Sequence, residues 1–510
     1  MKKLIPAYIL SFVISFMLYI NEPLLLYVNN KDDLHFNLGT VFVPMIKVFL
    51  FVFFILSLIF TIIYFINNKF NKKLYVYNIV LIIAFICFLA TYIQGNFLIE
   101  KLPSLNGATI PWTSYNNQNI ITLVIWLIII TIYILTIIKF KFEKVINVSK
   151  YISLSIFAML SVALITTMFT KDIFENRKIN YISKDNINIS SKNNNFYILL
   201  LDAVDSEYFY NILNTDNYKE IFEDFTYYPD TKSTFSYTKE SIPQILSGSI
   251  YDYKKSYQKF YNESMDNSPL INLLNEKKYD INIYDTGLLW TTEKSKIVKN
   301  INEFNKQYNT LCFAKEETKY ILFKYLPYFL KEYSKIDYFD FENCKREAEP
   351  NSYSWENEEL YKTLDEKIEK IDNNYFSFIH IRGAHVPFDL DENFNKIKNG
   401  TYDELIKGAL KIIKKYLNRL KENNIYDNSI IIIMADHGYN FDNPIGRQNP
   451  ILFIKGINEK HKFKISDKTI IYEDLMDIYK DLLNKKQTDD ILLNIKNREK
   501  NFLWYSKKQR

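Results

Sequence analysis

Three things that the sequence lacks limit the kinds of protein that it can encode. It has only three cysteines in 510 residues and no Cys-x-x-Cys pair, which argues against a cysteine-ligated zinc site. Its net charge is only +5, and lysines are interspersed with acidic residues instead of forming a basic run, so we expect no nucleic-acid partner. No segment repeats at a fixed period, which argues against a repeat architecture.

What the sequence does have is a strongly apolar first third. Five apolar stretches there have the composition of membrane-spanning helices. They run Leu4–Val28, Val41–Ile66, Leu74–Ile93, Ile120–Ile138 and Tyr151–Thr170. No small-residue cleavage site follows the first stretch, so we interpret it as a span rather than a signal peptide. The sequence thus predicts a five-helix transmembrane domain in residues 1–170.

The basic residues between the spans predict an orientation. "MKK" opens the chain, "NNKFNKK" (67–73) follows the second span and "KFKFEK" (139–144) follows the fourth, whereas the other two loops are poor in lysine. Basic loops favour the cytoplasmic side. We therefore expect a multi-pass protein of the cell (inner) membrane, with everything after Thr170 in the periplasm or at the cell exterior. Cys312 and Cys344 could pair in such an oxidising compartment, although spacing alone does not decide this.

The outer part of the chain has the pattern of an α/β domain. We expect a polar linker with one or two short helices over 171–194, and a catalytic domain over 195–510. Short apolar runs that suit strands buried on both faces occur at 196–203, 281–287, 375–381, 429–438 and 451–456. Helical periodicity occurs at 268–278 and 402–424. This alternation predicts a mostly parallel central sheet covered by helices, with ligands beyond the carboxyl ends of its strands.

Polar residues at the ends of these runs are candidates for a metal site. Asp436 and His437 follow five apolar residues in "IIIMADHG", and Asp202 ends "FYILLLDA". Carboxylate and imidazole groups can ligate zinc or manganese. Asp205 competes with Asp202, but we expect it to cap the helix that follows. An ordinary turn remains the alternative for Asp-His-Gly.

Two histidines lie in "FIHIRGAHVPFDL". His385 falls in the loop after the predicted strand, where a rigid sheet can position functional residues. His380 lies within the strand, and we interpret it as a core residue whose hydrogen bonds are satisfied.

These pieces together resemble a known family. A strand ending in Asp202, a hydroxyl followed by "SIP", then "GAHVP" and "ADHG", in that order behind five spans, resemble the alkaline phosphatase/sulfatase superfamily. More narrowly, they are similar to its membrane-anchored phosphoethanolamine transferases of lipid A and its lipoteichoic acid synthases. The resemblance implies that Thr238, three positions before Ser241 and ten before Gly248, is the nucleophile at a helix N-terminus. Thr234 and Ser236 are nearby rivals.

The resemblance also implies a site and a reaction. Asp202, Thr238, Asp436 and His437 would hold one divalent metal ion, Zn²⁺ or Mn²⁺. His385 would contact the phosphoryl group or transfer a proton. Arg447 would clamp the phosphate, with an ordinary loop arginine as the alternative. The expected reaction is transfer of phosphoethanolamine or phosphoglycerol from a phospholipid donor, through covalent phosphothreonine, to a surface glycan or glycolipid.

Departures from the family pattern keep other functions open. Formylglycine-dependent sulfatases need cysteine or serine at the nucleophile position, and a threonine stands here. The histidine that follows the Asp-His pair in the lipid A enzymes is not evident, since the next one after His437 is His461, so a second metal ion is not expected. The alternatives are a phosphodiesterase or sulfuric ester hydrolase with the same site, and a non-catalytic membrane protein with a degenerate domain.

Overall fold

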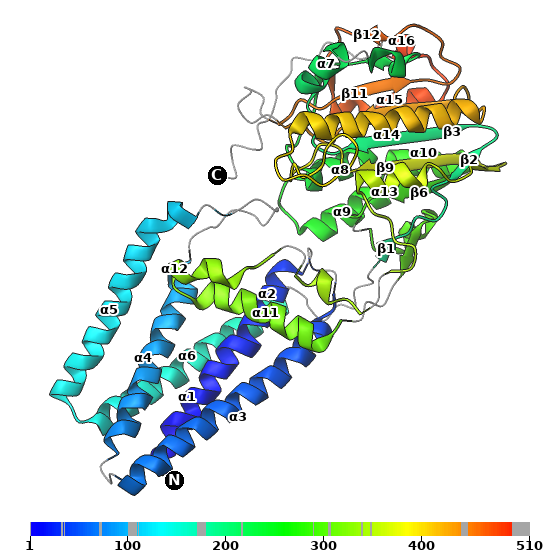
Figure 1. The fold of residues 1–510 in the computed structure, drawn as a ribbon. Helices are drawn as coiled ribbons and strands as arrows, with labels where there is room; N and C mark the ends of the chain where they lie inside the picture. The colour runs from blue at the N-terminus through cyan, green and yellow to red at the C-terminus, as the bar shows by residue number, and fades with distance from the viewer. Residues whose placement is uncertain are drawn as a thin grey trace. The chain divides into compact units, whose positions relative to one another are not determined.

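The computed structural model describes most of the chain as two compact units (Figure 1). The described residues are 2–31, 34, 36–70, 74–99, 110, 112–170, 180–215, 218–288, 290–303, 308–337, 340–346, 349–439 and 447–491. One unit comprises Met1–Arg177 and Asn305–Glu347, and the other comprises Lys178–Phe304 and Ala348–Arg510. We call them the membrane unit and the sheet unit.

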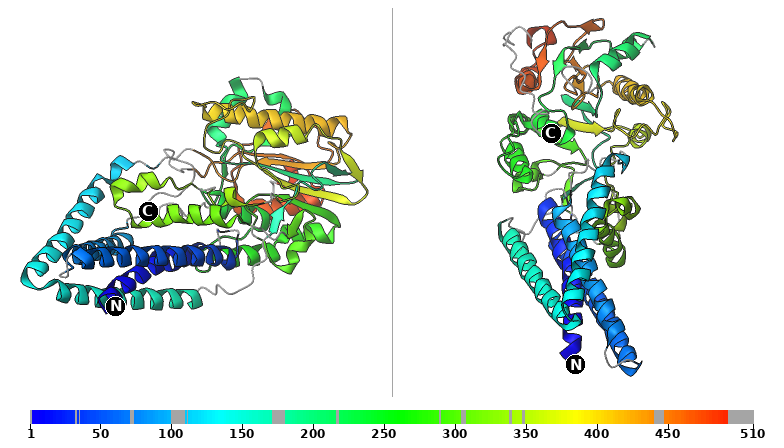
Figure 2. Two further views of the ribbon diagram at one scale, coloured as in Figure 1. Left: turned by 60° about the horizontal axis from the view of Figure 1, so that its bottom comes forward. Right: turned by 90° about the vertical axis from the view of Figure 1, so that its left-hand side faces the viewer.

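The membrane unit contains five long apolar helices, as the sequence predicts. Its helices long and apolar enough to cross a membrane run Lys2–Asn30, Leu38–Phe70, Tyr75–Phe97, Trp112–Lys139 and Phe142–Thr170. In element terms these are η1 (Lys2–Leu4), α1 (Ile5–Phe16), η2 (Met17–Asn21), α2 (Glu22–Asn30), α3 (Leu38–Phe70), α4 (Tyr75–Phe97), η3 (Trp112–Tyr115), α5 (Asn116–Lys139) and α6 (Phe142–Thr170). The helices α1, α3, α4 and α6 pack along one another (Figure 2).

A segment far along the sequence belongs to the membrane unit. It contains α11 (Thr310–Tyr325), α12 (Tyr328–Lys331), η6 (Glu332–Ser334) and η7 (Glu342–Cys344). A disulfide joins Cys312 to Cys344, with their Cα atoms 5.4 Å apart. Lys324 forms an ion pair with Glu22 of α2, and the Tyr325 hydroxyl donates to the same carboxylate at 3.2 Å. The sequence analysis placed this segment within the range 195–510, because its polar composition does not reveal that its buried face packs on membrane helices.

The sheet unit is built on a seven-stranded sheet with the order β12-β4-β11-β10-β3-β9-β6. Four adjacent strands are parallel: β10 (Ser429–Met434), β3 (Asn195–Leu201), β9 (Asn374–Ile381) and β6 (Tyr279–Tyr284). The next strand, β11 (Leu452–Lys455), runs antiparallel to β10. Every residue of β3 and β10 is buried, as their continuous apolar runs predict for strands covered on both faces. The mostly parallel sheet predicted from the sequence is confirmed.

Helices cover both faces of this sheet. One group packs together as α8 (Thr238–Ser247), α10 (Pro269–Glu276) and α15 (Leu475–Leu483), and another as α7 (Ser206–Thr215), α13 (Asn357–Thr363) and α14 (Tyr402–Glu422). The long helix α14 begins at a capping box between Thr401 and Glu404 and buries one apolar stripe, which matches its predicted periodicity.

The remaining elements of the sheet unit are short. They are β1 (Asn180–Ile182), β2 (Ile189–Ser191), η4 (Tyr218–Phe222), β4 (Thr226–Tyr227), β5 (Thr231–Lys232), α9 (Tyr257–Asp266), η5 (Glu293–Ile297), β7 (Ile301–Glu303), β8 (Glu369–Ile371), β12 (Lys464–Ile465), β13 (Ile470–Ile471), η8 (Tyr472–Asp474) and α16 (Thr488–Ile491). The expected short helices in 171–194 are therefore wrong for the described part of that range. Its segments form strands instead because β1 pairs with β7 and β2 with β8, contacts that local sequence does not reveal.

Candidate metal and nucleophile site

Polar side chains stand at the carboxyl ends of four neighbouring parallel strands. Asp436 follows β10, Asp202 follows β3, His380 lies near the end of β9 and Asp285 follows β6. Because these strands are adjacent and parallel, their carboxyl ends meet at one edge of the sheet. The edge therefore gathers residues that are far apart in the sequence.

Asp202, Asp436 and His437 form a buried group that could hold a metal ion. One ligand atom from each lies within 4.8 Å of the others, and none of these residues is more than 1% exposed. His437 Nε2 lies 3.2 Å from Asp436 Oδ2 and 3.9 Å from Asp202 Oδ1. His437 Nδ1 donates to the Gly438 carbonyl at 2.7 Å, which leaves the lone pair of Nε2 directed at the carboxylates.

The donor atoms of this group fit a divalent cation. Asp202 Oδ1 and Asp436 Oδ2 are buried and have no hydrogen-bond partner among the residues that the structure describes. With Nε2 of His437 they make three converging electron-pair donors that carry no proton of their own, an arrangement that a divalent cation would neutralise. Two carboxylate oxygens and one imidazole nitrogen suit Zn²⁺ or Mn²⁺.

Backbone contacts fix the Asp-His pair in place. Asp436 Oδ1 accepts hydrogen bonds from the backbone N–H groups of Ala203 and His437, at 3.0 and 2.9 Å. Gly438 allows a close approach, since a Cβ atom there would lie 2.6 Å from Asp205 Oδ2. Asp205 itself accepts from the backbone N–H of Glu207 in the first turn of α7, as expected for a capping residue.

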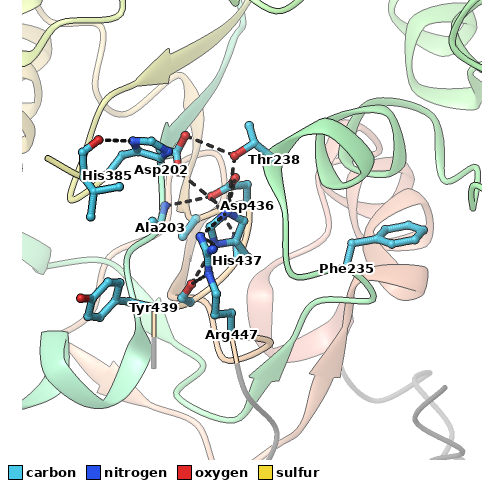
Figure 3. Close-up of polar contacts among 12 residues, drawn as sticks. Asp202, Ala203, Phe235, Thr238, His385, Asp436, His437, Tyr439 and Arg447 are labelled. Carbon is cyan, nitrogen blue, oxygen red and sulfur yellow. Dashed lines mark hydrogen bonds and ion pairs between the residues drawn. The ribbon is translucent and has the colours of Figure 1, made fainter. Parts of the chain in front are cut away.

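Thr238 is the first residue of α8, and its hydroxyl lies at the metal group (Figure 3). Its Oγ1 is 3.3 Å from Asp202 Oδ2 and 3.4 Å from His437 Nε2. The N-cap of α8 is Tyr237, which provides no side-chain cap, so backbone N–H groups of the first turn remain available to an anion. The rival Thr234 is otherwise engaged, because its Oγ1 accepts from Gln244 at 2.6 Å.

His385 and Arg447 lie beside the same group (Figure 3). His385 Nδ1 donates to the Val386 carbonyl at 2.6 Å, which leaves Nε2 as the atom able to exchange a proton. The Arg447 Nη2 atom is 3.0 Å from His437 Nδ1 and 3.1 Å from its Nε2, and the guanidinium lies over the Tyr237 ring at 5.4 Å. The structure thus brings together all six residues that the sequence analysis singled out.

Comparison with known families identifies the sheet unit. A model of the sulfatase family matches residues 195–478, more than half of the chain. The chain belongs to the sulfatase family. This confirms the superfamily suggested by the order of the motifs and the expected sulfatase-like α/β fold.

Comparisons with individual proteins add little to the family assignment. No curated protein matches the sequence. Among solved structures, lipooligosaccharide phosphoethanolamine transferase A (EptA) from Neisseria meningitidis is 12% identical, with 93% of this chain and 95% of that chain covered and a TM-score of 0.37. The lipoteichoic acid synthase LtaP from Listeria monocytogenes is 13% identical, with coverage of 58% and 73% and a TM-score of 0.35. Both TM-scores are below 0.5, so neither likeness carries an argument about this chain.

The charges in the sulfatase domain favour metal binding. Burial raises the pKa of Asp202, but the hydrogen bond from His380 and the nearby histidines outweigh burial and lower this pKa to about 2. Burial lowers the pKa of His437, which outweighs the opposite effect of Asp436. An ionised aspartate and a neutral imidazole are the protonation states that a metal ligand requires.

The interpretation of His380 as a core residue with satisfied hydrogen bonds is confirmed, but the sequence analysis identified neither of its partners and did not consider Asp285. His380 is buried, with Nε2 3.2 Å from Asp202 Oδ2 and Nδ1 2.8 Å from Asp285 Oδ1. Burial alone would lower the pKa of His380, but its bonds to the two carboxylates raise this pKa to about 10. The signal for Asp285 was present, because it ends the apolar run "INIYDTG" as Asp202 ends its own run.

Proposed function

We propose that the protein is a metal-dependent phosphotransferase. It moves phosphoethanolamine or phosphoglycerol from a membrane phospholipid to a surface glycan or glycolipid through covalent phospho-Thr238. One observation carries the proposal: a threonine hydroxyl at a helix N-terminus lies within 3.4 Å of two members of a buried metal-ligand group. The five membrane helices favour a lipid substrate, because they hold the chain where phospholipids are.

In the first half-reaction Thr238 Oγ1 loses its proton to solvent and attacks the phosphorus atom of the donor as an alkoxide. The O–P bond to threonine forms, the P–O bond to diacylglycerol breaks, and diacylglycerol leaves with a proton. His385 supplies that proton from Nε2 as the doubly protonated imidazolium, because its other N–H, on Nδ1, is committed to the Val386 carbonyl. A divalent ion held by Asp202, Asp436, His437 and Thr238 would lower the pKa of the threonine hydroxyl and draw charge from the phosphoryl oxygens.

In the second half-reaction His385 accepts a proton and Thr238 becomes the leaving group. A hydroxyl of the acceptor attacks the phosphothreonine and gives its proton to neutral His385, which restores the imidazolium, while the P–O bond to threonine breaks and Thr238 departs as an alkoxide. The N–H groups at the start of α8 and the Arg447 guanidinium hold the negative oxygens of the phosphoryl group. Water in place of the acceptor would give a hydrolase, so the two activities share one site.

Intact-mass analysis of the purified full-length protein tests the proposal. The protein is incubated with Zn²⁺ or Mn²⁺ and, in turn, phosphatidylethanolamine and phosphatidylglycerol. We expect a mass increase equal to the transferred group, absent from Thr238→Ala. Ser236→Ala is the matched control, since Ser236 is a buried hydroxyl two residues away, and it should still form the adduct. If neither donor forms an adduct but the protein releases phosphate or sulfate from an ester in a metal-dependent way, the result would contradict the transferase activity and favour the hydrolase activity.

A further inference from the structure

The polar edge of the sheet extends beyond the metal group. His380 stands on β9, between Asp202 at the end of β3 and Asp285 at the end of β6. We propose that His380 is a positioning residue for the metal centre: it holds Asp202 Oδ2 from behind so that Asp202 Oδ1 faces the ion, while Asp285 fixes the ring. This inference rests on the proposed metal-dependent function.

The strand pairing brings the three residues together. In the parallel register of β9 with β3, His380 is paired with Leu200, two residues before Asp202. In the register of β9 with β6, Tyr284 is paired with Ile379, so Asp285 comes level with His380 on the other side. The central position of β9 between β3 and β6 therefore lets one imidazole ring reach a carboxylate on each neighbouring strand.

The two oxygens of Asp202 have different surroundings. Oδ2 lies 3.2 Å from His380 Nε2 and 3.3 Å from the Thr238 hydroxyl. Oδ1 is buried, has no hydrogen-bond partner in the described part of the chain and lies 3.9 Å from His437 Nε2. A carboxylate without such a contact can rotate about its terminal bond and turn either oxygen away from the ion. Hydrogen bonds from behind a metal ligand restrict this rotation and set the direction of the ligand.

The ring of His380 is itself held on its other side. Its Nδ1 lies 2.8 Å from Asp285 Oδ1, and the same oxygen accepts from the backbone N–H of Gly287 at 3.1 Å. The Trp355 ring packs against the imidazole with 5.6 Å between ring centroids. Asp285 and Trp355 thus fix the ring orientation, although neither belongs to the candidate ligand group.

The competing explanation is that His380 only stabilises the fold, and measurements of metal binding distinguish this role from positioning of Asp202. Three variants are compared with wild type: His380→Leu, which loses both contacts, His380→Gln, whose amide can still donate to Asp202, and Asp285→Asn, which keeps the shape of the anchor. Phe378→Leu is the matched control, because Phe378 is buried two residues earlier on the same strand and side. The measurements are the Zn²⁺ dissociation constant by chelator competition, the visible absorption of the Co²⁺-loaded protein, and the Tm of the metal-free protein.

We expect His380→Leu to weaken Zn²⁺ binding about 10- to 100-fold, as for other residues that orient a metal ligand, and to change the Co²⁺ spectrum. His380→Gln should bind more tightly than His380→Leu, and Asp285→Asn more weakly than wild type. Phe378→Leu should lower the Tm without changing the dissociation constant or the spectrum.

Two results would overturn the inference. Wild-type affinity and spectrum in Asp285→Asn would do so even if His380→Leu fails to fold. If the wild-type protein binds no divalent ion at all, both this inference and the proposed function fail. Metal binding by wild type that is insensitive to His380 refutes only the positioning role.

Discussion

Gly383 links the loop that carries His385 to the backbone of Asp202, a proposed metal ligand. Its φ is +59°, in the left-handed region, and a Cβ atom there would lie 2.6 Å from the Asp202 backbone nitrogen and 2.7 Å from its carbonyl oxygen. Alanine in the left-handed conformation costs about 1–2 kcal/mol, and forcing an extra methyl against packed backbone costs about 1–3 kcal/mol more. Gly383→Ala should therefore destabilise the sulfatase domain by about 2–5 kcal/mol.

The location of the clash predicts more than a loss of stability. The atoms that must move belong to Asp202, so Gly383→Ala should weaken Zn²⁺ binding as well as lower the Tm measured by differential scanning fluorimetry. Gly287→Ala is the control, because the nearest atom to a Cβ there is 3.6 Å away, an ordinary contact. Wild-type Tm and metal affinity in Gly383→Ala would refute the close approach between this loop and Asp202.

Further predictions concern pH and the disulfide. The pKa of His380 rises from 6.5 to about 10 on folding, so its contribution to stability is complete below pH 6.5 and is lost as pH rises through 10. The Tm of the metal-free protein should therefore fall between these two pH values. The fall should be smaller in His380→Gln, which has no imidazole to titrate. The pKa of Asp202 falls from 3.8 to about 2 on folding, so its contribution to stability is present above pH 3.8 and is lost as pH falls through 2. Measuring the Tm of wild type and Asp202→Asn at decreasing pH would detect this loss. Cys312→Ser removes the disulfide that closes a loop with a sequence separation of 32 and should destabilise the membrane unit by roughly 3–4 kcal/mol. The Tm in detergent should fall accordingly, and an unchanged Tm would contradict this prediction.

The sequence was most informative where one physical rule acted alone. Strands buried on both faces must be apolar throughout, so β3 and β10 were recognisable, and the polar residue that ends each run marked Asp202 and Asp436. Membrane spans follow from length and hydropathy in the same direct way. Thr238 was found differently, from its spacing to Ser241 and Gly248 in a family pattern, because a lone hydroxyl before a helix has many ordinary uses.

The parts that the sequence did not predict depend on contacts between distant segments. A histidine inside a strand resembles a core residue until the neighbouring strands are known, and His380 lies 178 residues from Asp202 and 95 from Asp285. The α11 segment has a polar composition, so nothing local indicates that it packs on the membrane helices. The role of Gly383 is also a matter of tertiary contact, since only the approach of Asp202 makes a side chain at that position costly.

Anomalous diffraction at the zinc edge, from crystals of the Zn²⁺-loaded protein, tests the central claim most directly. The account predicts a peak enclosed by Asp202 Oδ1, Asp436 Oδ2 and His437 Nε2, with Thr238 Oγ1 or a phosphate on it as the fourth ligand. A peak away from these residues, or one at them with Thr238 turned out of coordination distance, would contradict a metal-activated threonine.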